Sequence, residues 1–116
     1  GAACHTGNRT CFFNNIVKKE YVEKNPLTVL ESVYAVIVDR MKNPKEDSYT
    51  NAVMEKGIDE ILKKLGHECT EIILAAKNPD SDDLKFEISD FMYHCMILMA
   101  QKNITWAEIA GELAQR

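Results

Sequence analysis

The chain contains no apolar run long enough to cross a membrane. Its longest nearly apolar stretch, Phe91 to Ala100, is about half the roughly 20 residues that a bilayer-spanning helix needs, and His94 interrupts it. The first residues also lack the charged and then apolar pattern of a signal peptide. We therefore expect a cytoplasmic protein.

Basic residues are not in excess, and cysteines are few and unclustered. Fourteen Lys and Arg stand against eighteen Asp and Glu, which gives a formal net charge of −4. A chain with this charge does not gain its affinity by wrapping nucleic-acid phosphates, so any phosphate it binds needs a local arrangement of side chains. Four scattered cysteines do not form a secreted disulfide scaffold, which agrees with a reducing compartment.

Strand-like alternation and internal repeats are absent after residue 28, where apolar residues recur at helical spacing. The length suits one domain with a single core. Residues 1–27 differ in character and end in a charged stretch before Pro26, which indicates a tail and a linker. We expect an all-α domain of four to five helices over residues 28–116.

Capping residues and turns predict where these helices begin and end. Thr28 followed by Glu31, and Thr105 followed by Glu108, form capping-box patterns. Gly57 is expected to end the second helix. The expected helices cover residues 28 to about 43, 48–57, 58–76, 81 to about 102, and 105 to about 113.

The fourth expected helix is apolar on every side over residues 91–99. A helix that is apolar all round must be buried all round. A domain of this size has too little chain to surround one helix by itself, so a second subunit is the economical cover. The sequence therefore predicts a homodimer with this helix at its centre.

Two pairs of acids lie at similar distances from the turn that joins the third and fourth helices. Glu68 and Glu71 precede the turn, Glu87 and Asp90 follow it, and each pair is three residues apart on one helix face. Because helices joined by a short turn pack as an antiparallel hairpin, the four acids should face one another. His94 shares the same narrow strip of the fourth helix.

Four carboxylates in a partly buried cluster repel one another and resist ionisation unless a cation is present. Oxygen ligands of this kind suit Mg²⁺ or Mn²⁺ better than zinc. The alternative is that these are ordinary solvated acids, because eighteen acids in 116 residues produce such spacings by chance. The spacing alone leaves both interpretations open.

Two segments closely resemble the phosphoribosyl-ATP pyrophosphohydrolase family, the second enzyme of histidine biosynthesis: SYTNAVMEKGIDEILKKLGHECTEIILAAKN and LKFEISDFMYHCMILMAQKNIT. The resemblance covers residues 28–116. It implies the all-α fold of the MazG-like nucleoside-triphosphate pyrophosphohydrolases, whose pattern is EExxE followed by ExxD. His67 stands where the first Glu of that pattern is expected. The resemblance implies that the metal ligands, which are also the catalytic acids, are Glu68, Glu71, Glu87 and Asp90.

The first twelve residues resemble the end of phosphoribosyl-AMP cyclohydrolase, the third enzyme of the pathway. In that family the cysteines that match Cys4 and Cys11 help to bind a catalytic zinc, together with a third cysteine upstream. The resemblance thus implies that residues 1–27 are a remnant of a cyclohydrolase domain plus a linker. Two thiolates cannot complete a tetrahedral zinc site, so we expect no cyclohydrolase activity from this chain.

The function that the resemblance implies is Mg²⁺-dependent hydrolysis of phosphoribosyl-ATP to phosphoribosyl-AMP and pyrophosphate, as one half of a bifunctional enzyme. Two alternatives remain open from the sequence. One is a housekeeping pyrophosphohydrolase of ordinary or damaged nucleotides. The other is a noncatalytic helical dimerisation module whose acids only increase solubility.

Several side chains are candidates for binding the substrate. Lysine and arginine could reach its phosphates, with Arg40 considered for the ribose 5-phosphate. Ser48 and Thr50 could donate hydroxyl hydrogens, although capping a helix is an equally good use of them. His94 could bind substrate or hold a ligand acid in place. The cationic candidates are Arg40, Lys56, Lys63, Lys64 and Lys77, with Lys64 and Lys77 preferred.

Overall fold

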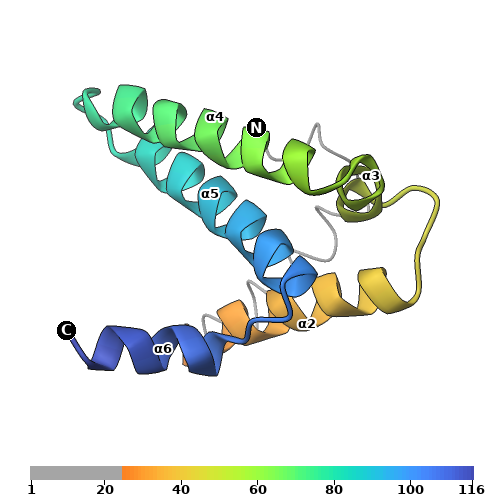
Figure 1. Cartoon of the computed structure of the whole chain (residues 1–116). Helices are drawn as coiled ribbons and strands as arrows, with labels where there is room; N and C mark the ends of the chain where they lie inside the picture. The colour runs from red at the N-terminus through yellow and green to blue at the C-terminus, as the bar shows by residue number, and fades with distance from the viewer. Residues whose placement is uncertain (1–24) are drawn as a thin grey trace. The chain divides into compact units, whose positions relative to one another are not determined.

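The computed structural model describes residues 25–116, and within that range it contains five α-helices and no β-strand. They are α2 (Thr28–Lys42), α3 (Tyr49–Lys56), α4 (Ile58–Ala76), α5 (Asp82–Gln101) and α6 (Trp106–Ala114), as Figure 1 shows. The all-α prediction is confirmed. Cys4 and Cys11, and most of the segment interpreted as a cyclohydrolase remnant, lie outside the described residues.

The chain divides into two compact units between Ala35 and Val36, within α2. In the first unit Asn25 organises the start of α2: its Oδ1 accepts a hydrogen bond of 3.0 Å from the Leu27 amide. The Thr28 hydroxyl donates to the Asn25 carbonyl over 2.7 Å. Thr28 is therefore the first helical residue and not the N-cap, so the predicted Thr28–Glu31 capping box is wrong. The physical reason is that the asparagine before Pro26 satisfies the start of the helix one turn earlier.

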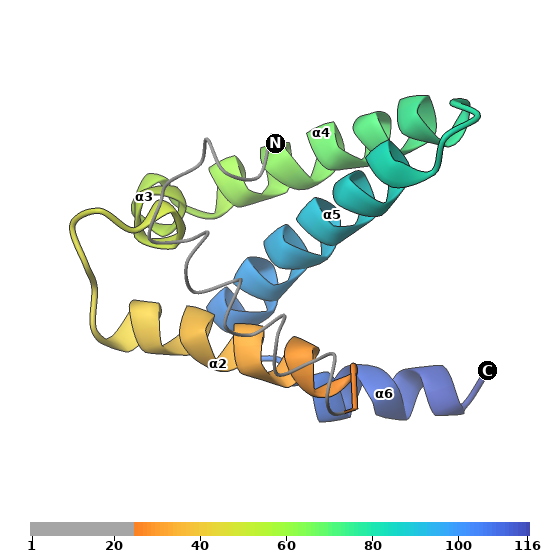
Figure 2. The ribbon, with the colours of Figure 1, turned by 180° about the vertical axis from the view of Figure 1, so that it is seen from behind.

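In the second unit, α4 and α5 lie along each other as an antiparallel hairpin, and α3 packs against both (Figures 1 and 2). The tip of the hairpin is fixed by side chains: Asp80 Oδ1 accepts from the Asp82 amide over 2.9 Å, and Asn78 Nδ2 donates to Asp83 Oδ2 over 3.3 Å. The N-cap of α5 is Ser81, whose side chain makes no capping hydrogen bond, so Asp80 satisfies the first amide of the helix from one residue before the cap. This hairpin sets the register of all side chains that face each other between the two helices.

Gly57 connects α3 to α4 without any intervening loop. Its φ of 95° lies in the region that side-chain-bearing residues avoid, and its amide donates to the Met54 carbonyl. Ser48 caps the other end of α3 by accepting from the Asn51 amide. The predicted second helix, from Ser48 to Gly57, is therefore confirmed, and so is the Thr105–Glu108 capping box of α6.

Isoleucine side chains form the centre of the second unit. Ile37, Ile61 and Ile97 are fully buried. Burying each such side chain stabilises the fold by about 1.5–3 kcal/mol. The other buried apolar residues are Val53, Ala75, Met96, Met99 and Ala100.

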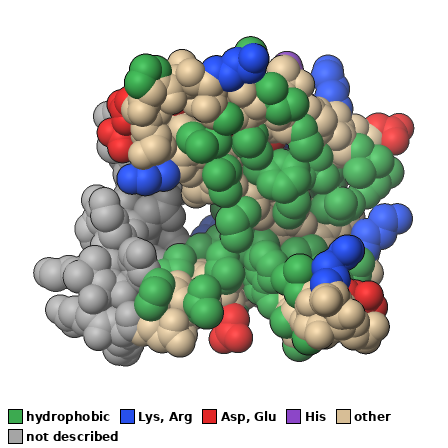
Figure 3. Space-filling view, turned by 90° about the vertical axis from the view of Figure 1, so that its left-hand side faces the viewer, with side chains coloured by type: hydrophobic (Ala, Val, Ile, Leu, Met, Phe, Trp, Pro, Cys, Tyr) green, Lys and Arg blue, Asp and Glu red, His purple; other side chains and the backbone are tan. Residues whose placement is uncertain are grey.

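The single chain does not cover all the apolar surface of the hairpin. Phe86 and Ile88 on α5 are 40% and 42% exposed, and Ile73 and Leu74 on α4 are also exposed. Figure 3 shows many hydrophobic side chains at the surface on one side of the molecule. This surface agrees with the predicted homodimer, which remains a prediction. None of the described helices combines the length and the apolar character required to span a bilayer.

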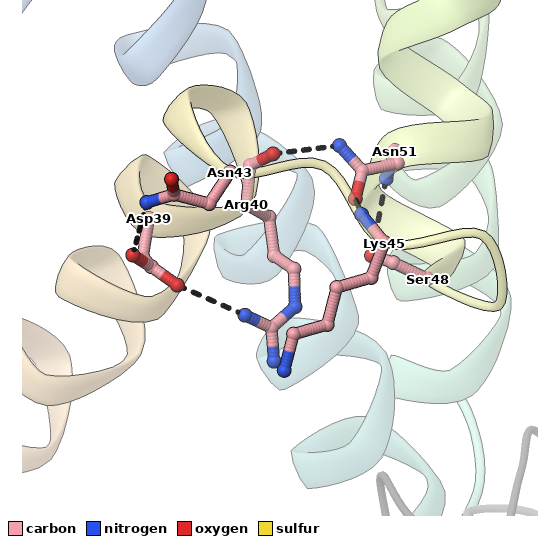
Figure 4. Close-up of polar contacts among 6 residues, drawn as sticks. All are labelled: Asp39, Arg40, Asn43, Lys45, Ser48 and Asn51. Atoms are coloured by element: carbon pink, nitrogen blue, oxygen red, sulfur yellow. Dashed lines mark hydrogen bonds and ion pairs between the residues drawn. The ribbon is translucent and has the colours of Figure 1, made fainter.

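The corner between α2 and α3 is held by one asparagine (Figure 4). Asn51 Nδ2 donates to the Arg40 carbonyl over 2.7 Å, and Asn51 Oδ1 accepts from the Lys45 amide over 2.9 Å. The Arg40 guanidinium pairs with Asp39 at 3.1 Å. Asn51 thereby fixes the end of α2 that carries Arg40 with respect to α3.

Candidate metal centre

Three potential ligand side chains converge between the middles of α4 and α5. One carboxylate oxygen of Glu68, one of Asp90 and a ring nitrogen of His94 all lie within 4.8 Å of one another. Glu68 and Asp90 come from opposite arms of the hairpin, at the similar distances from its tip that the sequence predicted. The hairpin geometry therefore brings the inner two of the four predicted acids together.

The other two acids lie closer to the tip. Glu71 and Glu87 line a hollow of about 340 Å³ together with Asp83 and Asn78. Their negative charges raise the pKa of neighbouring acids: Glu71 acts on both Glu68 and Glu87. Glu68, Glu71, Glu87 and Asp90, which we call the acid cluster, thus form one electrostatic unit at two levels along the hairpin.

Glu68 is the member of the acid cluster that is least satisfied. Its Oε2 is buried and has no hydrogen-bond partner in the described chain while the carboxylates are ionised. Burial raises the Glu68 pKa to about 7, followed by a side-chain hydrogen bond with Asp90 that requires a proton on one of the two carboxyls, and then by the negative charges of Asp90, Glu87 and Glu71. A proton shared with Asp90 or a bound cation would remove this unfavourable state. Burial likewise raises the pKa of Glu87, with Glu71, Asp90 and Asp83 adding to the effect.

His94 is not free to act as a ligand in this arrangement, although it lies beside the two acids. Its side chain is buried, its Nδ1 lies 2.9 Å from the Asp90 carbonyl oxygen, and its Nε2 lies 2.8 Å from the Tyr49 hydroxyl. Both ring nitrogens are therefore already hydrogen-bonded. The atoms that remain available to coordinate a metal are carboxylate oxygens, which fit Mg²⁺ or Mn²⁺ better than zinc.

Among the lysine and arginine candidates, Lys64 contacts Tyr49, the residue that is hydrogen-bonded to His94. Its Nζ lies 3.7 Å from Glu60 Oε2 and 5.9 Å from the centroid of the Tyr49 ring. Thr50, in contrast, is buried, and its hydroxyl lies 2.5 Å from the Tyr93 hydroxyl. The structure thus gives Thr50 a contact inside the protein, and Ser48 caps α3 through its hydroxyl.

The remaining candidates are spread over the surface. Arg40 pairs with Asp39, Lys56 lies in the last turn of α3, and Lys77 follows α4 as its C-cap. Within residues 25–116 no hydrogen bond or ion pair joins any of these three to the acid cluster. His67 is exposed next to the partly buried Glu68.

The sequence interpretation did not assign a role to Tyr49, which contacts His94 from α3. Tyr49 and Tyr93 were part of the segments that carry the resemblance, but their spacing did not connect them with the acids. Asn78 and Asp83 in the wall of the hollow were also missed as site residues. Their place at the tip of the acid-bearing hairpin was the signal that could have identified them.

A bifunctional protein is similar to this chain over the whole length of the chain. The histidine biosynthesis bifunctional protein HisIE of Caldanaerobacter subterraneus subsp. tengcongensis is 45% identical over 116 residues, which is 100% of this chain and 55% of that protein. The chain therefore spans about half the length of this relative.

Shorter relatives match the helical region. The phosphoribosyl-ATP pyrophosphatase of Clostridium novyi is 51% identical over 90 residues, covering 78% of this chain and 82% of that protein. The Bacillus cereus protein of the same name is 47% identical over 93 residues, covering 80% of this chain and 84% of that protein. A family model, that of phosphoribosyl-ATP pyrophosphohydrolase, matches residues 30–116. The chain belongs to the phosphoribosyl-ATP pyrophosphohydrolase family.

Proposed function

We propose that this chain hydrolyses phosphoribosyl-ATP to phosphoribosyl-AMP and pyrophosphate in histidine biosynthesis, with a divalent cation held by the acid cluster. The observation that carries the proposal is the buried, unpartnered Oε2 of Glu68, which lies opposite Asp90 and within the field of Glu71 and Glu87. A noncatalytic module whose acids only increase solubility has no need to bury a carboxylate oxygen without a partner. The choice of phosphoribosyl-ATP as the substrate rests on the family to which the chain belongs.

The acid cluster fits a hard cation because all of its potential ligand atoms are carboxylate oxygens. Glu68 and Asp90 would hold Mg²⁺, or Mn²⁺, at the inner level, and Glu71 and Glu87 would complete the binding from the outer level. When bound, the cation would neutralise phosphate charge and stabilise the charge that develops as the bond between the α and β phosphates breaks. The hollow beside Glu71 and Glu87 leaves open space next to the carboxylates.

The side chains of the protein have separate tasks in this proposal. One carboxylate of the acid cluster orients the attacking water and accepts its proton. Lys64, held over the Tyr49 ring, and Lys77 at the end of α4 supply positive charge to the phosphates of the substrate. Such local positive charge is necessary because the chain as a whole is acidic.

Three further features of the intact protein belong to the same proposal. The bifunctional relative supports an upstream cyclohydrolase domain, of which Cys4 and Cys11 would be remnant zinc ligands. The exposed apolar residues of α4 and α5 support a homodimer. The activity itself suits a cytoplasmic enzyme of amino-acid biosynthesis.

Pyrophosphate release tests the proposal. Phosphoribosyl-ATP, ATP and dATP are compared as substrates, with Mg²⁺ present and with the cation removed by EDTA. We expect release from phosphoribosyl-ATP only with Mg²⁺, and much slower release from ATP and dATP. Equal turnover of all three would favour the housekeeping alternative, and no Mg²⁺-dependent turnover of any would favour the noncatalytic module.

A further inference from the structure

Two hydroxyl groups from adjacent residues of α3 reach α5 next to the acid cluster. Tyr49 contacts His94 at 2.8 Å, and Thr50 contacts Tyr93 at 2.5 Å. The Tyr49 and His94 rings meet edge to face, with an interplanar angle of 84°. Adjacent residues of α3 therefore contact adjacent residues of α5, and of the two α3 residues only Tyr49 is hydrogen-bonded to His94.

The partners of His94 determine which ring nitrogen carries hydrogen. Nδ1 lies 2.9 Å from the Asp90 carbonyl oxygen, which can only accept. In the neutral ring, Nδ1 is therefore the donor and Nε2 the acceptor, so the Tyr49 hydroxyl donates to Nε2. The same Nδ1 lies 3.8 Å from the Asp90 carboxylate, which is too far for a hydrogen bond.

Without the Tyr49 hydroxyl, Nε2 would be a buried acceptor with no partner, since His94 is only 2% exposed. A buried nitrogen in this state favours any arrangement that gives it a new partner. The closest strong one would be a cation between Glu68 and Asp90, because a ring nitrogen of His94 lies within 4.8 Å of one carboxylate oxygen of each acid. Two carboxylates and one imidazole form a ligand set that favours transition metals over Mg²⁺.

We propose that Tyr49 is a positioning residue that determines metal specificity: by donating to His94 Nε2 it keeps the imidazole out of the metal site and reserves Glu68 and Asp90 for a hard cation such as Mg²⁺. This inference rests on the metal site of the proposed function. It adds a role for a side chain outside the acid cluster, and it assigns that role to one hydroxyl group.

Tyr49→Phe tests the proposal with little disturbance of the fold. The substitution removes only the hydroxyl, and it keeps the ring face over which Lys64 lies. Thr50→Val is the matched control, because it removes the neighbouring hydroxyl contact between α3 and α5 but leaves His94 bonded. Circular dichroism establishes that both variants remain helical.

Three measurements follow. In the metal-free chain, nitrogen NMR of His94 should show hydrogen on Nδ1 in the unmodified protein and in Thr50→Val, and a changed nitrogen signal in Tyr49→Phe. In calorimetric titrations with Mg²⁺ and Co²⁺, the ratio of Co²⁺ to Mg²⁺ affinity should rise about 10-fold in Tyr49→Phe and stay unchanged in Thr50→Val. The visible spectrum of bound Co²⁺ should gain the signature of a nitrogen ligand.

A double variant, Tyr49→Phe with His94→Gln, tests whether the imidazole causes the change. It should lose both the Co²⁺ preference and the nitrogen signature. The proposal is overturned if Tyr49→Phe and Thr50→Val lower the affinities for both metals equally, because the contacts would then serve only to hold α3 in place. It is also overturned if the ratio is unchanged while the unmodified chain binds Mg²⁺, an outcome that leaves the proposed function intact. Failure of the unmodified chain to bind Mg²⁺ would instead overturn the proposed function together with this inference.

Discussion

A carboxylate oxygen of Glu68 on α4 lies within 4.8 Å of one of Asp90 on α5, so the two arms of the hairpin meet through groups that repel when both are ionised. Burial of Glu68, followed by its hydrogen bond with Asp90 and the negative charge of Asp90, raises its pKa from 4.5 to about 7. This relationship makes the stability of the protein depend on pH, and with it the metal affinity that we propose for the site.

The first prediction concerns the stability of the metal-free chain. Between pH 4.5 and 7 the folded state retains a proton on Glu68 that the unfolded state has lost, so the free energy of unfolding falls as the pH rises through this window. Thermal unfolding in EDTA, measured in steps across that window, should show a falling midpoint. Glu68→Gln, which cannot ionise, should flatten the dependence. A midpoint that rises throughout this window would contradict the assignment.

The second prediction concerns stabilisation by Mg²⁺. A cation that binds only the folded state raises the free energy of unfolding by about 2.7 kcal/mol at 100 times its dissociation constant. The rise in midpoint should be larger above pH 7 than at about pH 5, because the proton on Glu68 competes with the cation. Thermal unfolding with Mg²⁺ and with Na⁺ at equal ionic strength measures the effect. Equal midpoints in the two salts would show that no specific site exists.

Loss of an acid from either level should abolish activity. Glu71→Ala and Asp90→Ala are each expected to lower the turnover of phosphoribosyl-ATP by about 100-fold or more, because each removes charge that holds the cation. The helical circular dichroism signal should remain. Glu112→Ala, an exposed acid on α6, is the matched control and should leave the turnover unchanged. An active Asp90→Ala variant would refute its assignment as a ligand.

Substitution by alanine should lower the free energy of unfolding more at core positions than at surface positions. Ile61→Ala or Ile97→Ala each opens a cavity at a fully buried position and should cost about 2–5 kcal/mol of unfolding free energy. Urea denaturation measures the loss. Leu113→Ala, at a residue that is 63% exposed, is the control and should cost far less. Comparable losses in all three variants would contradict the described core.

The homodimer can be tested through the exposed side of α5. Sedimentation equilibrium should give twice the chain mass of 13.2 kDa, with dissociation on dilution. Phe86→Lys places a charge in the expected interface and should shift the equilibrium towards the monomer. Lys85→Ala on the same helix is the control. A chain that sediments as a monomer at all concentrations would exclude this assembly.

The helices could be predicted because their ends carry strong local signals. Gly57 and the Thr105–Glu108 pair restrict the backbone through their own chemistry, independently of what packs against them. Glu68 and Asp90 could be predicted to face each other because the turn that joins α4 and α5 is short. The start of α2 was predicted less well, because two capping schemes, through Asn25 or through Thr28, compete within a few residues.

The contact between Tyr49 and His94 could not be predicted from spacing. The two residues are 45 positions apart, and their meeting depends on the direction in which α3 leaves α4. That direction is a property of tertiary packing and of one backbone torsion. The arrangement of the acids at two levels likewise depends on the axial register of α4 against α5, which helical periodicity alone does not define.

The backbone torsion φ of Gly57 determines the direction of α3 relative to α4, and so the contact between Tyr49 and His94. A methyl group at residue 57 would meet no atom within 4 Å, so space does not demand glycine there, whereas the positive φ does. The orientation of α3, which carries Tyr49, relative to α4, which carries Glu68, therefore depends on the backbone of a single residue. In the proposal that Tyr49 determines metal specificity, a substitution that relaxes this torsion would alter the preference among ions without changing any group that touches the ion.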